Sequence, residues 1–210
     1  MKMAHKLPPS SRSPSSITYR RKAARSIPGT IGVYALCDLD GVPIYVGLST
    51  DGIRQRVNRH ITSARSDIIA NRQIDVWEIA YVRCWPLTDK GQLDLLEAFL
   101  YHKYHPESAL MNGSVPRDVR KLDFEVKEPQ IVQLMADEEI KDRQRVELRL
   151  PRQAKHFGDL LDQFLTVKDS RELYLALQAH FGRLQKYFKN LRPSLSPDDS
   201  VKEDTDDFVA

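Results

Sequence analysis

The sequence contains TIGVYALC at residues 30–37 and VPIYVGL at residues 42–48, separated by the four residues DLDG. Both runs are rich in β-branched and aromatic residues, which is typical of strands. Asp40-Gly41 is a strong signal for a hairpin turn. Pro43 removes one backbone donor from the second strand, so that strand is expected at a sheet edge. The stretch therefore predicts a β-hairpin around which the fold is built.

The predicted hairpin places two tyrosines on one face. With a two-residue Asp40-Gly41 loop, Tyr34 lies opposite Gly47 and Tyr45 lies opposite Leu36. A four-residue loop keeps this parity, whereas a loop of odd length separates the two phenols. Tyrosines in strands usually serve packing. Gly32 and Gly47, however, favour close approach by a ligand or by another backbone.

The rest of the chain predicts further elements on both sides of a sheet. Apolar spacing indicates a helix over 52–65, a strand over 74–85, and a helix from Thr88 or Asp89 to about Tyr104. After Pro116 the pattern becomes helical over 130–148, 153–165 and 170–191. The expected fold class is α/β (α+β), with a three-stranded, mainly antiparallel sheet flanked by helices and a C-terminal helical region.

Composition divides the 210 residues into four segments. Residues 1–27 are basic, rich in Ser and Pro, and expected to be disordered. Residues 28–116 form the expected core, and residues 117–192 form a helical accessory region. Residues 193–210 are expected to be an acidic disordered tail.

Composition also indicates where in the cell the protein is located. The hydrophobic share of 41% is that of an ordinary globular domain. No apolar run is long enough to span a bilayer, and the first residues do not resemble a signal peptide. We therefore expect a cytoplasmic protein without a membrane partner.

Basic residues gather in the first 27 residues and between Arg54 and Arg72, although the net charge is only +3. Such clusters suit a polyphosphate partner, because neutralising phosphates releases counterions. Taken alone, they equally describe solvated arms and an ordinary charged helix face.

Arg56 and His60 are four residues apart and therefore share one face of the predicted helix. Arginine can bind a phosphate with two hydrogen bonds and stabilise charge that develops at phosphorus. Histidine titrates near neutral pH and can relay a proton or orient a phenol. The alternative is a surface arginine beside a half-exposed histidine.

Glu97 lies beside the apolar positions of the helix predicted to end near Tyr104. A carboxylate bordering a buried stripe must be paired or bound to a metal. An ion pair is the alternative to a metal site. Asn112 follows the Pro106 loop, where asparagine is also common for local reasons.

In combination these residues resemble the GIY-YIG nuclease superfamily. The sequence has GVY at 32–34, YVG at 45–47, then Arg56, Glu97 and Asn112, which is the order of the family pattern. The resemblance covers about residues 28–116. It implies an endonuclease that hydrolyses phosphodiester bonds in DNA.

The resemblance also implies roles for individual residues. Glu97 would hold Mg²⁺, or Mn²⁺, against the scissile phosphate, and no small-molecule cofactor is expected. Tyr34 and Tyr45 would place or deprotonate the attacking water, and Arg56 would neutralise the transition state. His60 would assist a phenol. We further expect contacts to DNA from a set of glycines and arginines: Gly32, Gly47, Arg54, Arg59 and Arg65.

Within the superfamily, the pair Arg56 and His60 is similar to GIY-YIG restriction endonucleases. The excision-repair branch has Tyr at the His position and Lys three residues after the second Tyr, where this chain has Leu48. Restriction-type cleavage of duplex DNA is therefore expected, and a homodimer would fit a palindromic target. A structure-selective repair or mobile-element nuclease is one alternative, and an inactive nucleic-acid-binding module is another.

Two features depart from the family pattern. The interval from Pro106 to Asn112 is longer than usual, which leaves the role of Asn112 open. The spacing from Tyr45 to Arg56 is one residue longer than in the repair branch. Arg54 is therefore an alternative to Arg56 for the phosphate role.

Overall fold

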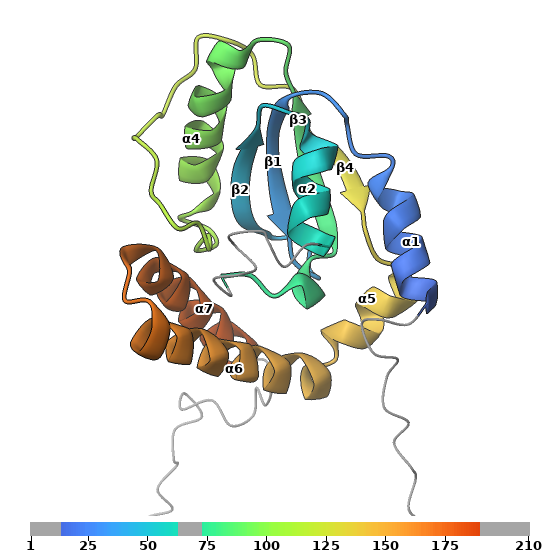
Figure 1. Cartoon of the computed structure of the whole chain (residues 1–210), viewed down its shortest axis with the longest axis vertical. Helices are drawn as coiled ribbons and strands as arrows, with labels where there is room; N and C mark the ends of the chain where they lie inside the picture. The colour runs from blue at the N-terminus through green and yellow to red at the C-terminus, as the bar shows by residue number, and fades with distance from the viewer. Residues whose placement is uncertain (1–13, 63–72, 190–210) are drawn as a thin grey trace, which may run out of the picture.

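The computed structural model describes residues 14–62 and 73–189, which build an antiparallel sheet with helices on both faces (Figure 1). The four strands lie in the order β2-β1-β3-β4, and all three pairs are antiparallel. The strands are β1 (Gly32–Cys37), β2 (Pro43–Ser49), β3 (Tyr81–Pro86) and β4 (Gln130–Gln133). The predicted fold class is confirmed, with one strand more than expected.

The hairpin has the register predicted from the turn. Tyr34 pairs with Gly47 and Leu36 pairs with Tyr45, and the register shifts only between Leu36 and Cys37. The Asp38 carboxylate accepts hydrogen bonds from the backbone N–H groups of Asp40 (3.0 Å) and Val42 (2.9 Å), which closes the turn. β2 is an edge strand, as the proline in it predicted.

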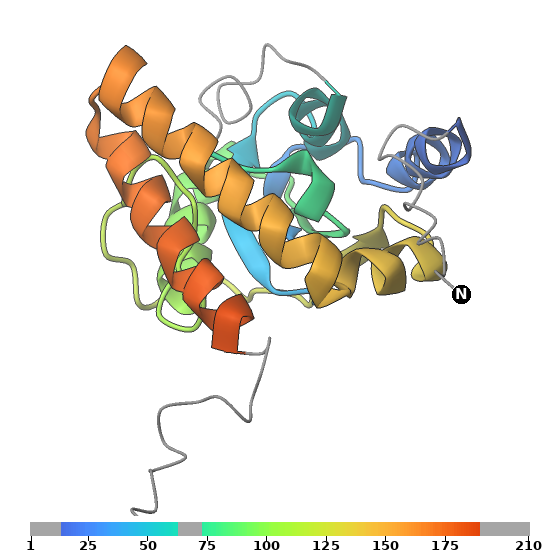
Figure 2. The same cartoon turned by 90° about the horizontal axis from the view of Figure 1, so that it is seen from below.

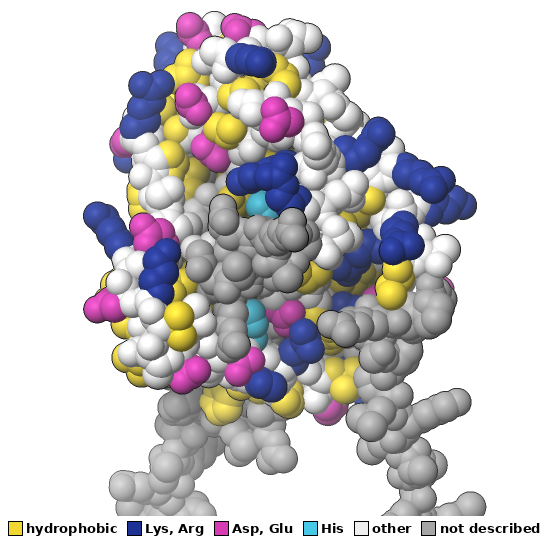
Figure 3. All heavy atoms as spheres, in the orientation of Figure 1, with side chains coloured by type: hydrophobic (Ala, Val, Ile, Leu, Met, Phe, Trp, Pro, Cys, Tyr) yellow, Lys and Arg dark blue, Asp and Glu magenta, His cyan; other side chains and the backbone are white. Residues whose placement is uncertain are grey.

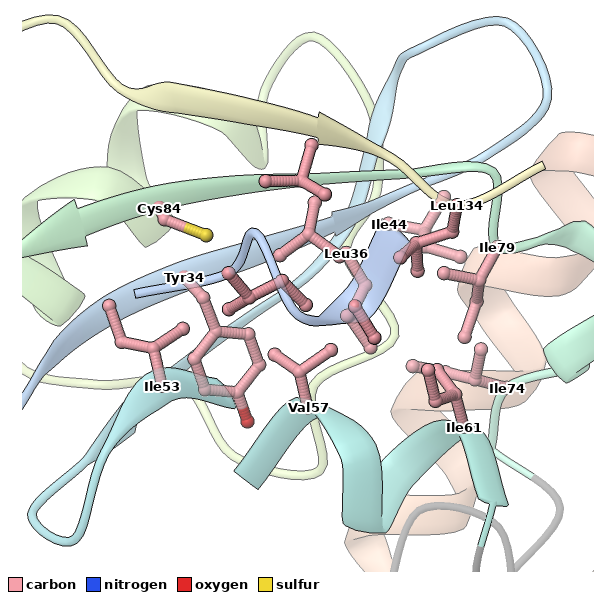
Figure 4. Close-up of a cluster of buried hydrophobic side chains, with 14 of the residues drawn as sticks. Tyr34, Leu36, Ile44, Ile53, Val57, Ile61, Ile74, Ile79, Cys84 and Leu134 are labelled. Carbon is pink, nitrogen blue, oxygen red and sulfur yellow. The ribbon is translucent and has the colours of Figure 1, made fainter. Parts of the chain in front are cut away.

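The two faces of β1 pack against different helices. Tyr34 and Leu36 belong to the core cluster that includes Ile53 and Val57 of α2 (Ile53–Thr62), and Figure 4 shows these side chains together. Val33 and its alternating neighbours pack on the other face against α4 (Leu93–Tyr104). The alternation of side chains along β1 therefore separates a layer containing α2 from a layer containing α4.

The remaining elements surround this core. They are α1 (Pro14–Ala24), the 3₁₀ turns η1 (Val76–Glu78) and η2 (Lys90–Gln92), α5 (Asp137–Gln144), α6 (Val146–Asp162), the π-helical turn η3 (Gln163–Val167) and α7 (Arg171–Lys189). α6 and α7 lie side by side below the sheet (Figure 2). Within the described ranges, no helix has the length and apolar character needed to cross a membrane.

Residues 130–133 form a strand, so the helix predicted over 130–148 is wrong at its start. Val132 is buried and pairs with Val82 of β3. Leu134 then donates its backbone N–H to Ala80 O at 2.7 Å. Hydrogen bonds to the otherwise open edge of β3 make this segment a strand, because they outweigh the local helix propensity of these residues. This fourth strand corrects the expected three-stranded sheet.

The predicted strand 74–85 also begins later than expected, at Tyr81. The Asp75 carboxylate accepts a hydrogen bond from Trp77 N at 3.0 Å and caps the turn η1. An aspartate that binds a backbone N–H two residues on favours a turn over an extended strand. This local bond explains the difference.

Residues 14–24 form α1, where the sequence predicted a disordered arm over 1–27. The helix is held by Arg20, whose guanidinium donates to Val76 O (3.4 Å) and Ile79 O (3.3 Å). Partners far along the chain therefore stabilise a segment of low hydrophobicity. The expectations for residues 1–13 and 193–210 lie outside the described residues.

A buried ion network joins α6 and α7 to the hairpin turn and to η1. Arg149 binds Glu78 (2.9 Å) and Asp40 (2.7 Å), and it also donates to Tyr187 Oη at 2.8 Å. Arg183 of α7 forms an ion pair with the buried Asp38. The two C-terminal helices thus bind the turn that sets the hairpin register.

We predict that Arg149→Leu lowers the free energy of unfolding by about 3–5 kcal/mol, because Glu78 is left buried with fewer compensating charges. The measurement is urea unfolding near neutral pH. The control is Arg145→Leu, whose side chain is 52% exposed and for which about 0–1 kcal/mol is expected. Equal losses in both variants would contradict a structural role for the network.

Candidate active site

Tyr34, Tyr45 and His60 form one aromatic cluster. The Tyr34 hydroxyl lies 2.7 Å from His60 Nε2, which is hydrogen-bond distance. The Tyr45 ring centroid lies 6.3 Å from that of Tyr34 and 5.8 Å from that of His60. The hairpin register and the helix thus bring together the three side chains that the sequence placed on one face.

The start of α2 fixes the position of His60. Gly52 precedes the helix, and a Cβ there would lie 2.5 Å from Gly29 O, so the backbone approaches too closely for any other residue. Ile53 and Val57 then face the core. His60, three residues after Val57, shares this side and is only 2% exposed. The alternative of a half-exposed histidine is therefore not observed.

Two glycines make room for the cluster and for the sheet. At Gly47, a Cβ would lie 2.7 Å from Tyr34 Oη and 2.8 Å from Tyr45 Cε1. At Gly32, a Cβ would lie 2.3 Å from Trp85 O. Both glycines are thus explained by contacts within the protein. Their contact with DNA stays a prediction.

Tyr34 has no exposed surface, and burial raises the pKa of its phenol well above the usual value. Tyr45 adds to the rise in pKa, whereas the charge of Arg56 and a hydrogen bond with it oppose the rise. Tyr34 therefore remains protonated at neutral pH unless an acceptor takes its proton. His60 Nε2 lies at hydrogen-bond distance and accepts from the phenol when the imidazole carries its proton on Nδ1.

Glu97 lies on α4, which packs against the face of β1 opposite Tyr34, and its charge raises the pKa of Tyr34. The backbone of Leu48 in β2 is near its carboxylate. Burial, followed by the charge of Asp94, raises the pKa of Glu97 to about 7, and the Leu48 N–H and Arg56 act in the opposite direction. A nearby cation stabilises the charged form of such a half-buried carboxylate.

Arg56 is close enough to Tyr34 and Glu97 for its charge to lower the pKa of both groups. Its Nε is buried and has no hydrogen-bond partner within the described residues. A buried guanidinium N–H without a partner is costly, and an anionic oxygen is the acceptor that suits it best. The arrangement can therefore receive a phosphate.

Asn112 binds the outer edge of β2. Its side-chain amide donates to Val46 O (2.7 Å) and accepts from Val46 N (3.1 Å). Met111 N donates to Ile44 O at 2.7 Å beside it. The long interval after Pro106 thus still delivers Asn112 to the hairpin, between Tyr45 and Gly47.

The other predicted DNA-contacting arginines differ in their surroundings. Arg54 donates through Nε to Ile27 O at 2.7 Å, so it holds the segment before β1. Arg59 is exposed on α2. Arg65 lies outside the described residues. Of the two candidates for the phosphate role, Arg56 is the one that touches the tyrosine cluster.

Comparison with known proteins assigns this part of the chain. Residues 30–111 match the model of the GIY-YIG catalytic domain. This part of the chain belongs to the GIY-YIG family. Neither the curated proteins nor the solved structures gave a match to the chain. The GIY-YIG domain contains both tyrosines, Arg56, His60 and Glu97, and Asn112 follows it directly.

A GIY-YIG domain implies nuclease activity on DNA, and nucleases of this family are generally metal-dependent. In this GIY-YIG domain, the described residues place the aromatic cluster, a guanidinium and a carboxylate around one end of β2. Residues 30–111 therefore carry the features of a nuclease domain of this family.

Sequence reasoning missed two supports of the GIY-YIG site. The backbone N–H of Leu48 lowers the pKa of Glu97, and no side-chain pattern predicts a backbone group there. The acids of the hairpin turn, Asp38 and Asp40, bind arginines of α6 and α7. Two acids in a tight turn indicate possible ion pairs. Their partners could not be identified from the sequence, because these lie more than one hundred residues away along the chain.

We predict that Gly47→Ala reduces the rate of DNA cleavage at least about tenfold, because overpacking of roughly 1–3 kcal/mol must displace one of the phenols. The control is Gly158→Ala on α6, where a Cβ meets nothing within 4 Å. Single-turnover cleavage by the two variants is the measurement. Full activity of Gly47→Ala would show that the phenols need not hold these positions.

Proposed function

We propose that this chain is a metal-dependent endonuclease that cleaves duplex DNA at specific sites, as restriction enzymes do. The observation that carries the proposal is the Tyr34–His60 hydrogen bond, with Tyr45, Arg56 and Glu97 around it. These side chains include candidates both for activating the attacking water and for binding the phosphate.

The residues of the site fit one hard divalent cation. Among the described residues there is no group of three or more His, Cys, Asp or Glu side chains that could enclose a metal. Mg²⁺ commonly uses one or two carboxylates together with substrate phosphate oxygens and water. Glu97, whose pKa burial raises to about 7, supplies such a carboxylate. When bound there, Mg²⁺ or Mn²⁺ would supply Lewis acidity at the scissile phosphate.

The two phenols are proposed to place the attacking water, and one of them removes its proton. A free phenol has a pKa of about 10, so it needs help to act as a base at neutral pH. His60 Nε2 gives that help to Tyr34, whose hydroxyl is 2.7 Å away. Tyr45 is less buried than Tyr34 and is suited to orienting the water.

Arg56 is proposed to bind the scissile phosphate through its guanidinium and to stabilise the charge of the transition state. Asn112 holds the edge of β2 beside Tyr45 and acts as a positioning residue. Arg59 contributes to DNA binding from the exposed side of α2.

The restriction-type assignment is supported by His60 and by the accessory helices. His60 is buried, on the same helix as Arg56, and bound to a phenol. α5, α6 and α7 follow the nuclease domain and are proposed to contribute to target recognition. The described residues form one such site, so we propose that two copies cut the two strands of a palindromic target.

The test is incubation of plasmid DNA with wild type and Glu97→Gln, in Mg²⁺ and after chelation. We expect discrete fragments from wild type only when Mg²⁺ is present, and a loss of at least about a hundredfold in Glu97→Gln, because a metal ligand is removed. Glu107→Gln, an exposed change beyond the same helix, is the matched control and should cleave normally.

The outcomes separate the alternatives. Cleavage only at flaps or junctions would replace restriction by repair or mobile-element activity. No cleavage by wild type over a range of DNAs and metals would leave a binding module. Cleavage by Glu97→Gln at the wild-type rate would remove Glu97 from its role as metal ligand.

A further inference from the structure

α1 has two opposite faces with different chemistry. The inner face carries Arg20, Ala24 and, after the helix, Ile27, at spacings of four and three residues. Ala24 is 4% exposed and Ile27 is fully buried, and both belong to the core cluster under α2. Arg20 binds two backbone carbonyls, and burial lowers its pKa to about 10. This face docks α1 on the domain.

The connection from α1 to α2 is also fixed by hydrogen bonds. Arg54 of α2 donates through its backbone N–H to Pro28 O (2.9 Å) and through Nε to Ile27 O (2.7 Å). Gln130 of β4 donates to Ser26 O at 2.9 Å. α1 is therefore held to the same helix that carries Arg56 and His60.

The outer face of α1 is basic. Arg21 and Lys22 on the last turn of α1 and Arg25 directly after it are all exposed. No ion pair to any of the three is present within residues 14–62 and 73–189. The sequence has no acid before Asp38 that could neutralise them locally. We call these three residues the α1 basic stripe.

The α1 basic stripe and α2 are presented on the same side of the molecule. Figure 1 shows both helices beside the sheet, and Figure 3 shows Lys and Arg side chains over α1 and near α2 on the face seen there. Arg59 and Arg56 add positive charge from α2. A rigid, elongated polyanion is the partner that such separated positive charges fit.

We propose that the α1 basic stripe binds the sugar–phosphate backbone of duplex DNA that flanks the cleavage site. This inference rests on the proposed function, because it assigns a further contact to the same substrate. Arg21 and Arg25 offer bidentate donors to phosphate oxygens, and Lys22 offers a point charge. These contacts raise affinity and fix register without reading the base sequence.

The test measures binding of the full chain to a duplex of about 30 base pairs at several salt concentrations, by fluorescence anisotropy without divalent metal. The variant is Arg21→Ser/Lys22→Ser/Arg25→Ser. The control Lys168→Ser/Arg171→Ser/Lys186→Ser removes the same charge from exposed positions on and just before α7. Thermal unfolding verifies that both variants remain folded.

We expect the α1 variant to bind at least about tenfold more weakly near physiological salt. The slope of log K against log salt should fall in magnitude by about two to three, since each lost phosphate contact removes roughly 0.9. The control should keep the wild-type slope. An unchanged slope in the α1 variant, or an equal fall in the control, would overturn the inference.

This result is separable from that of the proposed function. If the α1 variant binds DNA more weakly than wild type but wild type cuts no DNA, the binding surface stands and the nuclease assignment is refuted. If wild type cuts DNA but the α1 variant has the same slope of log K against log salt as wild type, the nuclease assignment stands and the binding surface is refuted.

Discussion

The register of the β1–β2 hairpin is the constraint on which the site depends. It places Tyr34 opposite Gly47 and therefore on the same face as Tyr45. A slip of one residue in β2 would send Tyr45 to the face covered by α4. The hydrogen bond from Tyr34 to His60 then joins this face of the sheet to α2. The geometry of the candidate site therefore depends on core packing, because Tyr34 belongs to both the site and the core cluster.

Other parts of the molecule act by holding that register. Asp38 closes the turn with its carboxylate, Asn112 binds both backbone groups of Val46, and Arg149 ties the turn to α6. The C-terminal helices are therefore more than an appended region, since they bind acids of the hairpin turn. Their buried charges cost desolvation, so the intact network adds little net stability, whereas removal of one partner leaves an uncompensated buried charge.

Much of the fold and the site could be predicted because the signals are local or follow a fixed period. Asp40-Gly41 and strand alternation gave the hairpin register, and the spacing of Arg56 and His60 gave one helix face. The rest depends on distant partners. Gln130–Gln133 became a strand because β3 had an open edge, and α1 formed because Arg20 found carbonyls in η1 and after it. The effect of the Leu48 backbone on Glu97 follows from no pattern in the sequence.

Tyr34 and His60 are proposed to work as one proton-accepting unit, and a double-mutant cycle tests this proposal most directly. Single-turnover cleavage rates in Mg²⁺ would be compared for wild type, Tyr34→Phe, His60→Ala and the double variant. We predict that the double variant is no slower than the slower single variant, to within about twofold, because the effects of groups that act together are not additive. Losses that multiply in the double variant would mean that the two residues have independent roles and would contradict a single proton-accepting unit.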